Sequence, residues 1–139
     1  MGLRIQLVKD DEVICELPLK PEEWEPQALE RELRQIELNV VRMQRIHRIL
    51  SNETRIRMLC EMARGSRRRF SELMEEVDAN QKVISESLRG MLENDLIEKV
   101  QDRPRVLYYA LSPLGFASFL SSIAMCRIMD EIKRMGGEL

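Results

Sequence analysis

The chain of 139 residues has little of the chemistry that most catalytic and metal sites use. It contains one histidine, His47, so a catalytic triad or a two-histidine metal site needs its remaining groups from elsewhere. Its three cysteines, Cys15, Cys60 and Cys126, lie far apart and form no Cys-x-x-Cys pair. This spacing argues against a zinc knuckle or a disulfide framework and is typical of reduced thiols. We expect neither a metal nor a cofactor.

The sequence also has no long hydrophobic run. No stretch of 18 apolar residues occurs, and Arg4, Gln6 and Lys9 interrupt the N-terminus in a way that signal peptides do not. Aromatic residues are only 4% of the chain, but hydrophobic residues are 44%, which is enough to form a core. No glycine-rich phosphate loop, catalytic carboxylate pair or nucleophile–base motif stands out. We therefore expect a cytoplasmic domain with an appendage, no membrane contact and no enzymatic activity.

The net charge of −2 lacks the basic excess of a simple nucleic-acid coat, but the charge is unevenly distributed. Residues 1–40 contain five Lys or Arg against ten Asp or Glu and carry −5. Residues 42–69 contain nine arginines against two glutamates and carry +7, whereas residues 70–111 carry −4. Blocks of opposite sign favour surfaces with different partners, although arginines on a helix are also an ordinary solvated face.

Residues 3–17 predict a β-hairpin, because apolar and polar residues alternate on both sides of a polar turn at 9–12. A lone hairpin is marginal in water, so this one must pack on another surface. Three prolines keep residues 18–26 out of regular structure. Trp24 is the expected packing anchor of this linker.

A long helix is predicted over residues 27–50, which contain neither proline nor glycine. Its apolar side chains are spaced alternately by four and three residues, the a/d pattern of helices that pair along a narrow seam. Such a helix would be about 36 Å long. It pairs either with the same helix of a second chain or with the C-terminal helix of its own chain, and we favour the dimer. The seam consists of Leu29, Leu33, Ile36, Val40, Met43, His47 and Leu50.

The next part of the chain predicts three short helices followed by two strands, which is the order of a winged helix-turn-helix. The helices are expected over 53–65, 70–77 and 80–94, and the strands over 97–100 and 106–111. In the first helix Ile56, Leu59, Cys60 and Ala63 are expected to face the core, and in the third Val83, Ile84, Leu88, Met91 and Leu92.

A last helix is predicted to begin at Ser112-Pro113, which is a helix cap followed by a proline at the first helical position. It extends to about Met135 and carries apolar side chains over a broad arc. An arc of that width indicates burial on more than one side of the helix.

Three segments carry a resemblance to a known family. Residues 50–59 (LSNETRIRML) resemble the opening of ArsR-type transcriptional regulators, and residues 88–99 (LRGMLENDLIEK) resemble the end of their recognition helix. Residues 105–115 (RVLYYALSPLG) are similar to the wing strand and closure shared by ArsR-, HxlR- and MarR-like repressors. The resemblance covers about half of the chain, from residue 46 to 116. It implies a homodimer whose second helix-turn-helix helix enters the major groove of double-stranded DNA.

Carried over position by position, the resemblance implies a set of DNA contacts. On the helix over 80–94, which is the second helix of the helix-turn-helix, Asn80 and Gln81 suit adenine edges, and Lys82 or Arg89 suits guanine or phosphate. The wing tip can reach the DNA backbone or the minor groove, and arginines before the helix-turn-helix can hold phosphates. The full set is Asn80, Gln81, Lys82, Ser85, Glu86, Arg89, Arg103, Arg105, Arg67, Arg68 and Arg69.

The expected dimer interface uses the long helix and the last helix. It comprises Leu29, Leu33, Ile36, Val40, Met43, His47, Phe116, Leu120 and Ile123. The cysteine pair and the acidic and histidine sets of the metal-sensing relatives have no counterpart, so we expect no metal site. The family has no constant N-terminal extension, and we expect the hairpin to pack on the wing-bearing domain or on the partner subunit.

Three positions depart from the family pattern. Asp95 stands where glycine is usual, Glu86 stands where many relatives have a basic or neutral polar residue, and Ser87 stands where many have histidine. Phosphates repel a carboxylate in the groove unless it accepts a hydrogen bond from cytosine N4 or pairs with Lys82 or Arg89. These alternatives remain open from the sequence.

The sequence therefore predicts a mainly α fold with a small β component. We expect an N-terminal hairpin and proline-rich linker over 1–25, a long helix over 26–50, a winged helix-turn-helix over 51–112 and a dimerisation helix over 113–139. The predicted function is dimeric transcriptional regulation through DNA, with the operator and any effector unspecified. The alternative is a winged-helix module that binds another protein and does not bind DNA specifically.

Overall fold

The computed structural model describes residues 2–137, so Met1 and the last two residues of the predicted C-terminal helix segment lie outside the described part. The chain divides into two compact units. One unit, here called the N-terminal unit, comprises Met1–Val40 and Cys126–Leu139. The other, here called the winged unit, comprises Val41–Met125.

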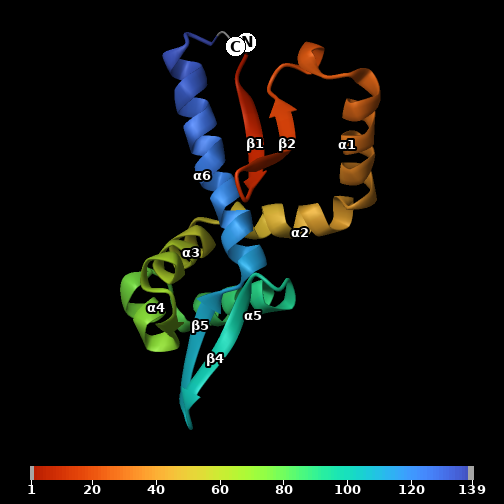
Figure 1. Ribbon diagram of the computed structural model, residues 1–139. Helices are drawn as coiled ribbons and strands as arrows, with labels where there is room; N and C mark the ends of the chain where they lie inside the picture. Colours follow the sequence, from red (N-terminus) through yellow and green to blue (C-terminus); the bar gives the residue numbers. More distant parts are fainter. Residues whose placement is uncertain (1, 138–139) are drawn as a thin grey trace. The chain divides into compact units, whose positions relative to one another are not determined.

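The N-terminal unit begins with the predicted hairpin, which is confirmed. Strands β1 (Arg4–Lys9) and β2 (Glu12–Pro18) pair antiparallel, with Ile5 opposite Leu17 (Figure 1). The two turn residues, Asp10 and Asp11, both have positive φ, as the tight turns of β-hairpins require, and aspartate tolerates this conformation.

A short 3₁₀ helix η1 (Pro21–Glu23) and the linker lead to helix α1 (Pro26–Leu38). The indole N–H of Trp24 donates to the carbonyl oxygen of Pro18 at 2.7 Å, so this half-buried ring is tied to the end of the hairpin. The Glu25 carboxylate caps α1 by accepting from the backbone N–H groups of Gln27 and Ala28.

The helix predicted over residues 27–50 is divided in two, because the chain leaves the helical conformation at Asn39 before α2 (Val40–Leu50). The backbone N–H of Asn39 donates to the carbonyl oxygens of Gln35 and Ile36. Its side-chain amide donates to the Gln35 carbonyl oxygen at 2.8 Å. These bonds satisfy carbonyls that an ending helix leaves unpaired, which explains why an unbroken apolar pattern does not form one helix.

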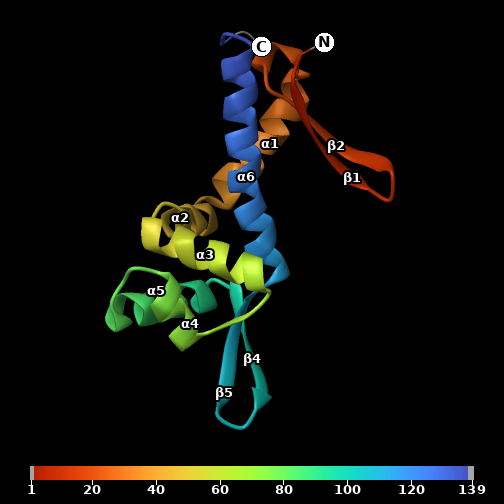
Figure 2. The ribbon, with the colours of Figure 1, turned by 90° about the vertical axis from the view of Figure 1, so that its left-hand side faces the viewer.

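The winged unit has the predicted winged helix-turn-helix order. Helices α3 (Glu53–Gly65), α4 (Phe70–Glu76) and α5 (Gln81–Glu93) precede strands β4 (Ile97–Arg103) and β5 (Val106–Leu111). A two-residue strand β3 (Arg68–Arg69), which the sequence did not predict, joins the sheet in the order β3-β5-β4. All of its pairs are antiparallel. Figure 2 shows α4, α5 and the β4–β5 wing side by side below α3.

The core of the winged unit is built from one face each of α3, α4 and α5 and from the start of β4. On α3 the buried residues are Met58, Leu59 and Met62, so the stripe predicted for this helix is wrong at Ile56 and Ala63, which are exposed. An α-helix with apolar residues at adjacent positions offers two overlapping stripes, and the position of its neighbours decides between them. The core residues are Ile49, Met58, Leu59, Met62, Leu73, Val77, Ile84, Leu88, Met91, Leu96 and Ile97.

The start of α6 (Pro113–Arg134) is tied to the start of the wing. The Ser112 hydroxyl donates to the Asp95 carbonyl oxygen at 2.6 Å and accepts from the Gly115 N–H at 2.9 Å, which confirms the predicted cap. A Cβ on Gly115 would lie 1.7 Å from the Leu96 carbonyl oxygen, so only glycine fits. Asp95 has φ 59°, the left-handed conformation that glycine adopts most easily, which accounts for the family's usual glycine there.

Among the described residues of the winged unit, the part of α6 up to Met125 does not show the burial that was expected on more than one side. In the winged unit Phe116 is 46% exposed, and Leu120 and Ile123 are similarly exposed. Large apolar side chains that remain accessible along one helix mark a surface that another molecule can cover.

Candidate nucleic-acid interface

Helix α5 presents two chemically different faces. Ile84, Ser87, Leu88 and Met91 are buried against the core. The opposite face is exposed and carries Gln81, Lys82, Ser85, Glu86 and Arg89. Val83 is also outside, with 37% of its surface exposed, so the prediction that it faces the core is wrong. The helix therefore has a polar, accessible surface with one apolar residue on it.

The first turn of α5 is held by Asn80, the residue before the helix. Its side-chain oxygen accepts from the Val83 N–H at 2.9 Å, which caps the helix. An asparagine reads adenine through both its oxygen and its amide N–H₂, and here the oxygen already has a partner. This cap was not part of the predicted role of Asn80, although an Asn directly before an amphipathic stretch is a recognised helix-start signal.

The side chains of Lys82, Ser85 and Glu86 have no hydrogen-bond or ion-pair partner within residues 2–137. Arg89 lies 3.9 Å from the Glu93 carboxylate, one helical turn further on. That pair is largely exposed, so it adds little to stability and releases the guanidinium easily. Neither of the predicted pairs of Glu86, with Lys82 or with Arg89, is formed.

The wing ends in a two-residue turn at Pro104 and Arg105, because Arg103 is paired with Val106. Arg105 has φ 71°, a conformation that disfavours non-glycine residues. Arg103 and Arg105 are exposed, and neither forms an ion pair with any residue that the structure describes. The tip is thus a pair of unneutralised cations.

The three arginines before α4 have distinct environments. The guanidinium of Arg67 lies 4.2 Å from the centre of the Tyr108 ring and 3.4 Å from the Asp102 carboxylate, so it holds the wing from the side. Arg68 is turned inward: it donates to the Glu61 carbonyl oxygen and lies 3.6 Å from the Glu61 carboxylate. Arg68 is therefore a structural residue of the helix α3 end, whereas Arg67 and Arg69 are nearer to solvent.

A carboxylate supports the junction between β3 and α4. Glu72 accepts from the Arg69 N–H at 2.9 Å and lies 3.6 Å from the Arg69 guanidinium and 3.8 Å from that of Arg68. The backbone hydrogen bond lowers the pKa of the Glu72 carboxyl below its ordinary value, and the two guanidinium charges act in the same direction against partial desolvation.

The residues predicted for the dimer interface belong to two groups. On α1, Leu33 and Ile36 are exposed and Leu29 is half-buried. In the winged unit a groove of about 420 Å³ lies between α2 and α6, lined by Met43, Ile46, His47, Leu50, Ala117, Ser118 and Ser121. The exposed Phe116 and Leu120 belong to the same stretch of α6. The His47 ring is exposed, and its Nδ1 lies 2.9 Å from the Met43 carbonyl oxygen.

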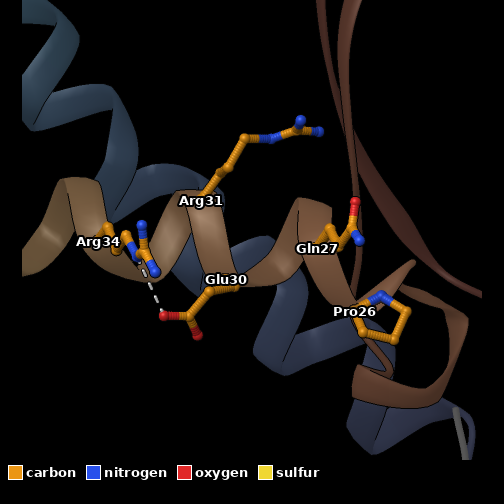
Figure 3. Close-up of a pocket in the computed structure, with 5 residues that line it drawn as sticks. All are labelled: Pro26, Gln27, Glu30, Arg31 and Arg34. Atoms are coloured by element: carbon orange, nitrogen blue, oxygen red, sulfur yellow. Dashed lines mark hydrogen bonds and ion pairs between the residues drawn. The ribbon is translucent and has the colours of Figure 1, made fainter.

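Another hollow, of about 360 Å³, lies on α1 (Figure 3). Its residues come from one helix, and Arg34 pairs with Glu30 at 3.3 Å while Arg31 extends away from this pair. Such a surface holds no nucleophile and no metal-ligand set. Across residues 2–137, no three His, Cys, Asp or Glu side chains gather as metal ligands do. None of the helices in this range has the length and apolar character needed to cross a membrane.

The three-helix core, the β3-β5-β4 sheet and the projecting β4–β5 hairpin define a winged helix-turn-helix protein. Residues 52–99 match the family model described as bacterial regulatory protein, arsR family. The chain thus carries an ArsR-family helix-turn-helix domain at these residues, which overlap the first two of the three sequence segments, whereas residues 105–115 lie beyond the match.

Solved structures share this fold. A MarR-family transcriptional regulator from Enterococcus faecalis has a TM-score of 0.58 and 21% identity, with 76% of this chain and 93% of that chain covered. The transcriptional repressor BigR from Xylella fastidiosa has a TM-score of 0.57 and 18% identity, with 68% and 93% covered. The homodimeric winged helix-turn-helix DNA-binding domain Mb0332 from Mycobacterium bovis has a TM-score of 0.54 and 16% identity, with 70% and 85% covered. The sequence matches none of the curated proteins with which it was compared.

Proposed function

We propose that the chain is a homodimeric, DNA-binding transcriptional regulator of the cytoplasm. Helix α5 enters the major groove, and the wing tip contacts the backbone or the minor groove. The observation that carries this proposal is the exposed face of α5, where Lys82, Ser85 and Glu86 have no partner among the described residues. Polar side chains aimed outward from the second helix of an ArsR-type domain suit base edges and phosphates.

The cations support DNA contact at the wing as well as on α5. Arg103 and Arg105 are exposed at the wing tip, and neither has a carboxylate partner within residues 2–137. Arg67, held between Tyr108 and Asp102, orients the wing and still has part of its guanidinium in solvent. Arg69 completes the phosphate-facing set, whereas Arg68 serves the fold through Glu61.

A second copy of the chain would cover the exposed apolar surface of α2 and α6. Within the winged unit Phe116, Leu120 and Ile123 are exposed, and the groove at Met43 and His47 adjoins part of this surface. The homodimeric state of the Mb0332 domain supports the same assembly for this chain. Two copies would place their two α5 helices in the major groove one helical turn apart, on the same face of the DNA duplex.

Fluorescence anisotropy with labelled duplexes tests the proposal. With about six phosphates neutralised per dimer, the logarithm of affinity should fall with the logarithm of salt at a slope near −5. Lys82→Ala combined with Arg89→Ala should weaken binding more than about tenfold. Lys9→Ala combined with Arg31→Ala removes the same charge from the N-terminal unit and should leave binding unchanged. Absence of binding to every duplex at low salt would refute DNA regulation.

A second candidate function is a protein-interaction module. The −5 charge of residues 1–40 and the exposed apolar residues of the hairpin, such as Leu7 and Ile14, favour it. Glu86 on the DNA-reading face favours it too. A purified partner that still binds after Lys82→Ala and Arg89→Ala, but no longer binds after deletion of residues 1–20, would support this function. Its binding should then be insensitive to competitor DNA.

A further inference from the structure

Two residues on the exposed face of α5 are poorly suited to simple phosphate binding. Glu86 is negatively charged, and Val83 is apolar with 37% of its surface exposed. Valine is also a weaker helix former than alanine or lysine, so helix stability does not favour it at an exposed position. Both residues therefore call for a contact outside the chain, and on the proposed function that contact is DNA.

The carboxylate of Glu86 needs hydrogen-bond donors when it enters the groove. Arg89 pairs instead with Glu93, and Lys82 lies beyond ion-pair distance of Glu86. In the major groove the base donors are the amino groups of cytosine and adenine. Adenine places the acceptor N7 beside its amino group, which would repel a carboxylate, whereas cytosine presents its N4 amino group without an adjacent acceptor. Cytosine is therefore the base that fits Glu86.

Val83 lies one helical turn before Glu86, and side chains three residues apart on a helix are neighbours. The two positions are separated by about 4.5 Å along the helix axis, comparable with the spacing of stacked base pairs. The branched side chain of Val83 offers methyl groups, which suit the C5-methyl of thymine. Asn80 does not compete for this place, because its side-chain oxygen caps the Val83 N–H.

We infer that α5 reads a cytosine and a thymine at neighbouring base pairs, with Glu86 accepting from the cytosine N4 amino group and Val83 covering the thymine methyl group. This inference rests on the proposed function and specifies the DNA that it takes. Glu86 then lowers affinity for all other sequences by repelling phosphates and so raises discrimination. The low net positive charge of α5 therefore favours discrimination between DNA sequences over general affinity for DNA.

Selection from a pool of random-sequence duplexes tests the inference with the full-length chain. The wild type should enrich duplexes with a cytosine beside a thymine in each half-site. Glu86→Ala should reduce the cytosine preference about tenfold and increase affinity for unrelated duplexes. Glu86→Ala and Val83→Ala each introduce a better helix former at an exposed position of α5, and circular dichroism should show an unchanged fold. The matched controls are Glu98→Ala on β4 and Val13→Ala in the hairpin, which should leave the selected sequence unchanged.

Replacing the selected thymine by deoxyuridine removes only the methyl group. Wild-type binding should weaken about fourfold, as expected for one buried methyl group, and Val83→Ala should show no such loss. Equal sensitivity of the wild type and Val83→Ala to deoxyuridine would overturn the thymine contact. A uniform gain in affinity of Glu86→Ala on every duplex, with the cytosine preference retained, would overturn the cytosine contact. Absence of binding by the wild type to the whole pool would instead refute the proposed function itself.

Discussion

Residues 2–137 form two β-hairpins that differ in how they are supported. The N-terminal hairpin, β1–β2, is a two-stranded sheet in which no strand residue is fully buried, and Leu7 is 60% exposed. The wing, β4–β5, starts at the buried Ile97 and gains a third strand, β3, along β5. The turn of the first hairpin carries Asp10 and Asp11, whereas the turn of the wing carries Arg105.

This difference shows that strand pairing alone does not support a hairpin whose tip is exposed. The wing is anchored at its base to α6 through Ser112 and Gly115, so its tip can remain polar and exposed. The N-terminal hairpin is tied to Trp24 at Pro18, but it has exposed apolar side chains toward its turn. A hairpin of that kind requires a covering surface, because two strands alone are marginal in water.

The largest effect should come from the base of the wing. Gly115→Ala would put a methyl group 1.7 Å from the Leu96 carbonyl oxygen, so the backbone must move. We expect a loss of at least about 3 kcal/mol in the free energy of unfolding. A melting temperature lower by roughly 10 °C in a calorimetric scan would check this. Gly90→Ala is the matched control, since a Cβ there meets nothing within 4 Å, and should stabilise α5 by about 0.5–1 kcal/mol.

The anchor at Gly115 was predictable in part. The sequence Ser112-Pro113 predicts a helix start, and the similarity to the ArsR-type closure includes the glycine two residues after Pro113. The close approach to Leu96, however, depends on the packing of the start of α6 against the segment between α5 and β4, which no local pattern encodes. In the same way β3 has only two residues, too few to produce an alternating pattern.

The exposed face of α5 was predicted well in its polar residues and poorly in Val83. Alternation and helical periodicity assign an apolar residue to the core, because apolar side chains are usually buried away from water. Arg68 and Asn39 illustrate the same limit for polar residues. Arg68 turns toward Glu61 and Asn39 ends α1, although a basic run and an unbroken heptad pattern favour a phosphate contact and a continuous helix.

The second prediction concerns the opposite charges of the two hairpin tips. Arg103→Ala combined with Arg105→Ala removes four cations from a dimer, so DNA affinity should fall by at least about tenfold. The salt slope should become shallower, from about −5 to roughly −2. Asp10→Asn combined with Asp11→Asn neutralises the other tip and, because asparagine tolerates positive φ, keeps the turn. Equal changes in slope from both pairs would contradict a special role for the wing.

The third prediction concerns the cover of the N-terminal hairpin. If its exposed apolar end packs on the partner subunit, deleting residues 1–20 should raise the dimer dissociation constant by about tenfold, as sedimentation equilibrium would measure. Leu7→Ser combined with Ile14→Ser should reproduce part of this change without removing the strands, since both side chains are exposed in the single chain. A truncated chain that stays equally dimeric and equally heat-stable would contradict the packing.

The smallest effect should come from Glu72, which secures the strand that widens the wing sheet. Its pKa is lowered in the folded chain by the Arg69 N–H and by the nearby guanidinium groups, so ionised Glu72 stabilises the fold. This contribution is complete above the ordinary glutamate pKa of about 4.3 and is lost as the pH falls through the lower folded-state pKa. Glu72→Gln should therefore be less stable than the wild type at pH 6, and the two melting temperatures should converge near pH 3. Glu75→Gln, on the same helix but without an ion pair among residues 2–137, is the control. A constant difference between wild type and Glu72→Gln across this range would mean that the hydrogen bond, and not the charge, joins β3 to α4.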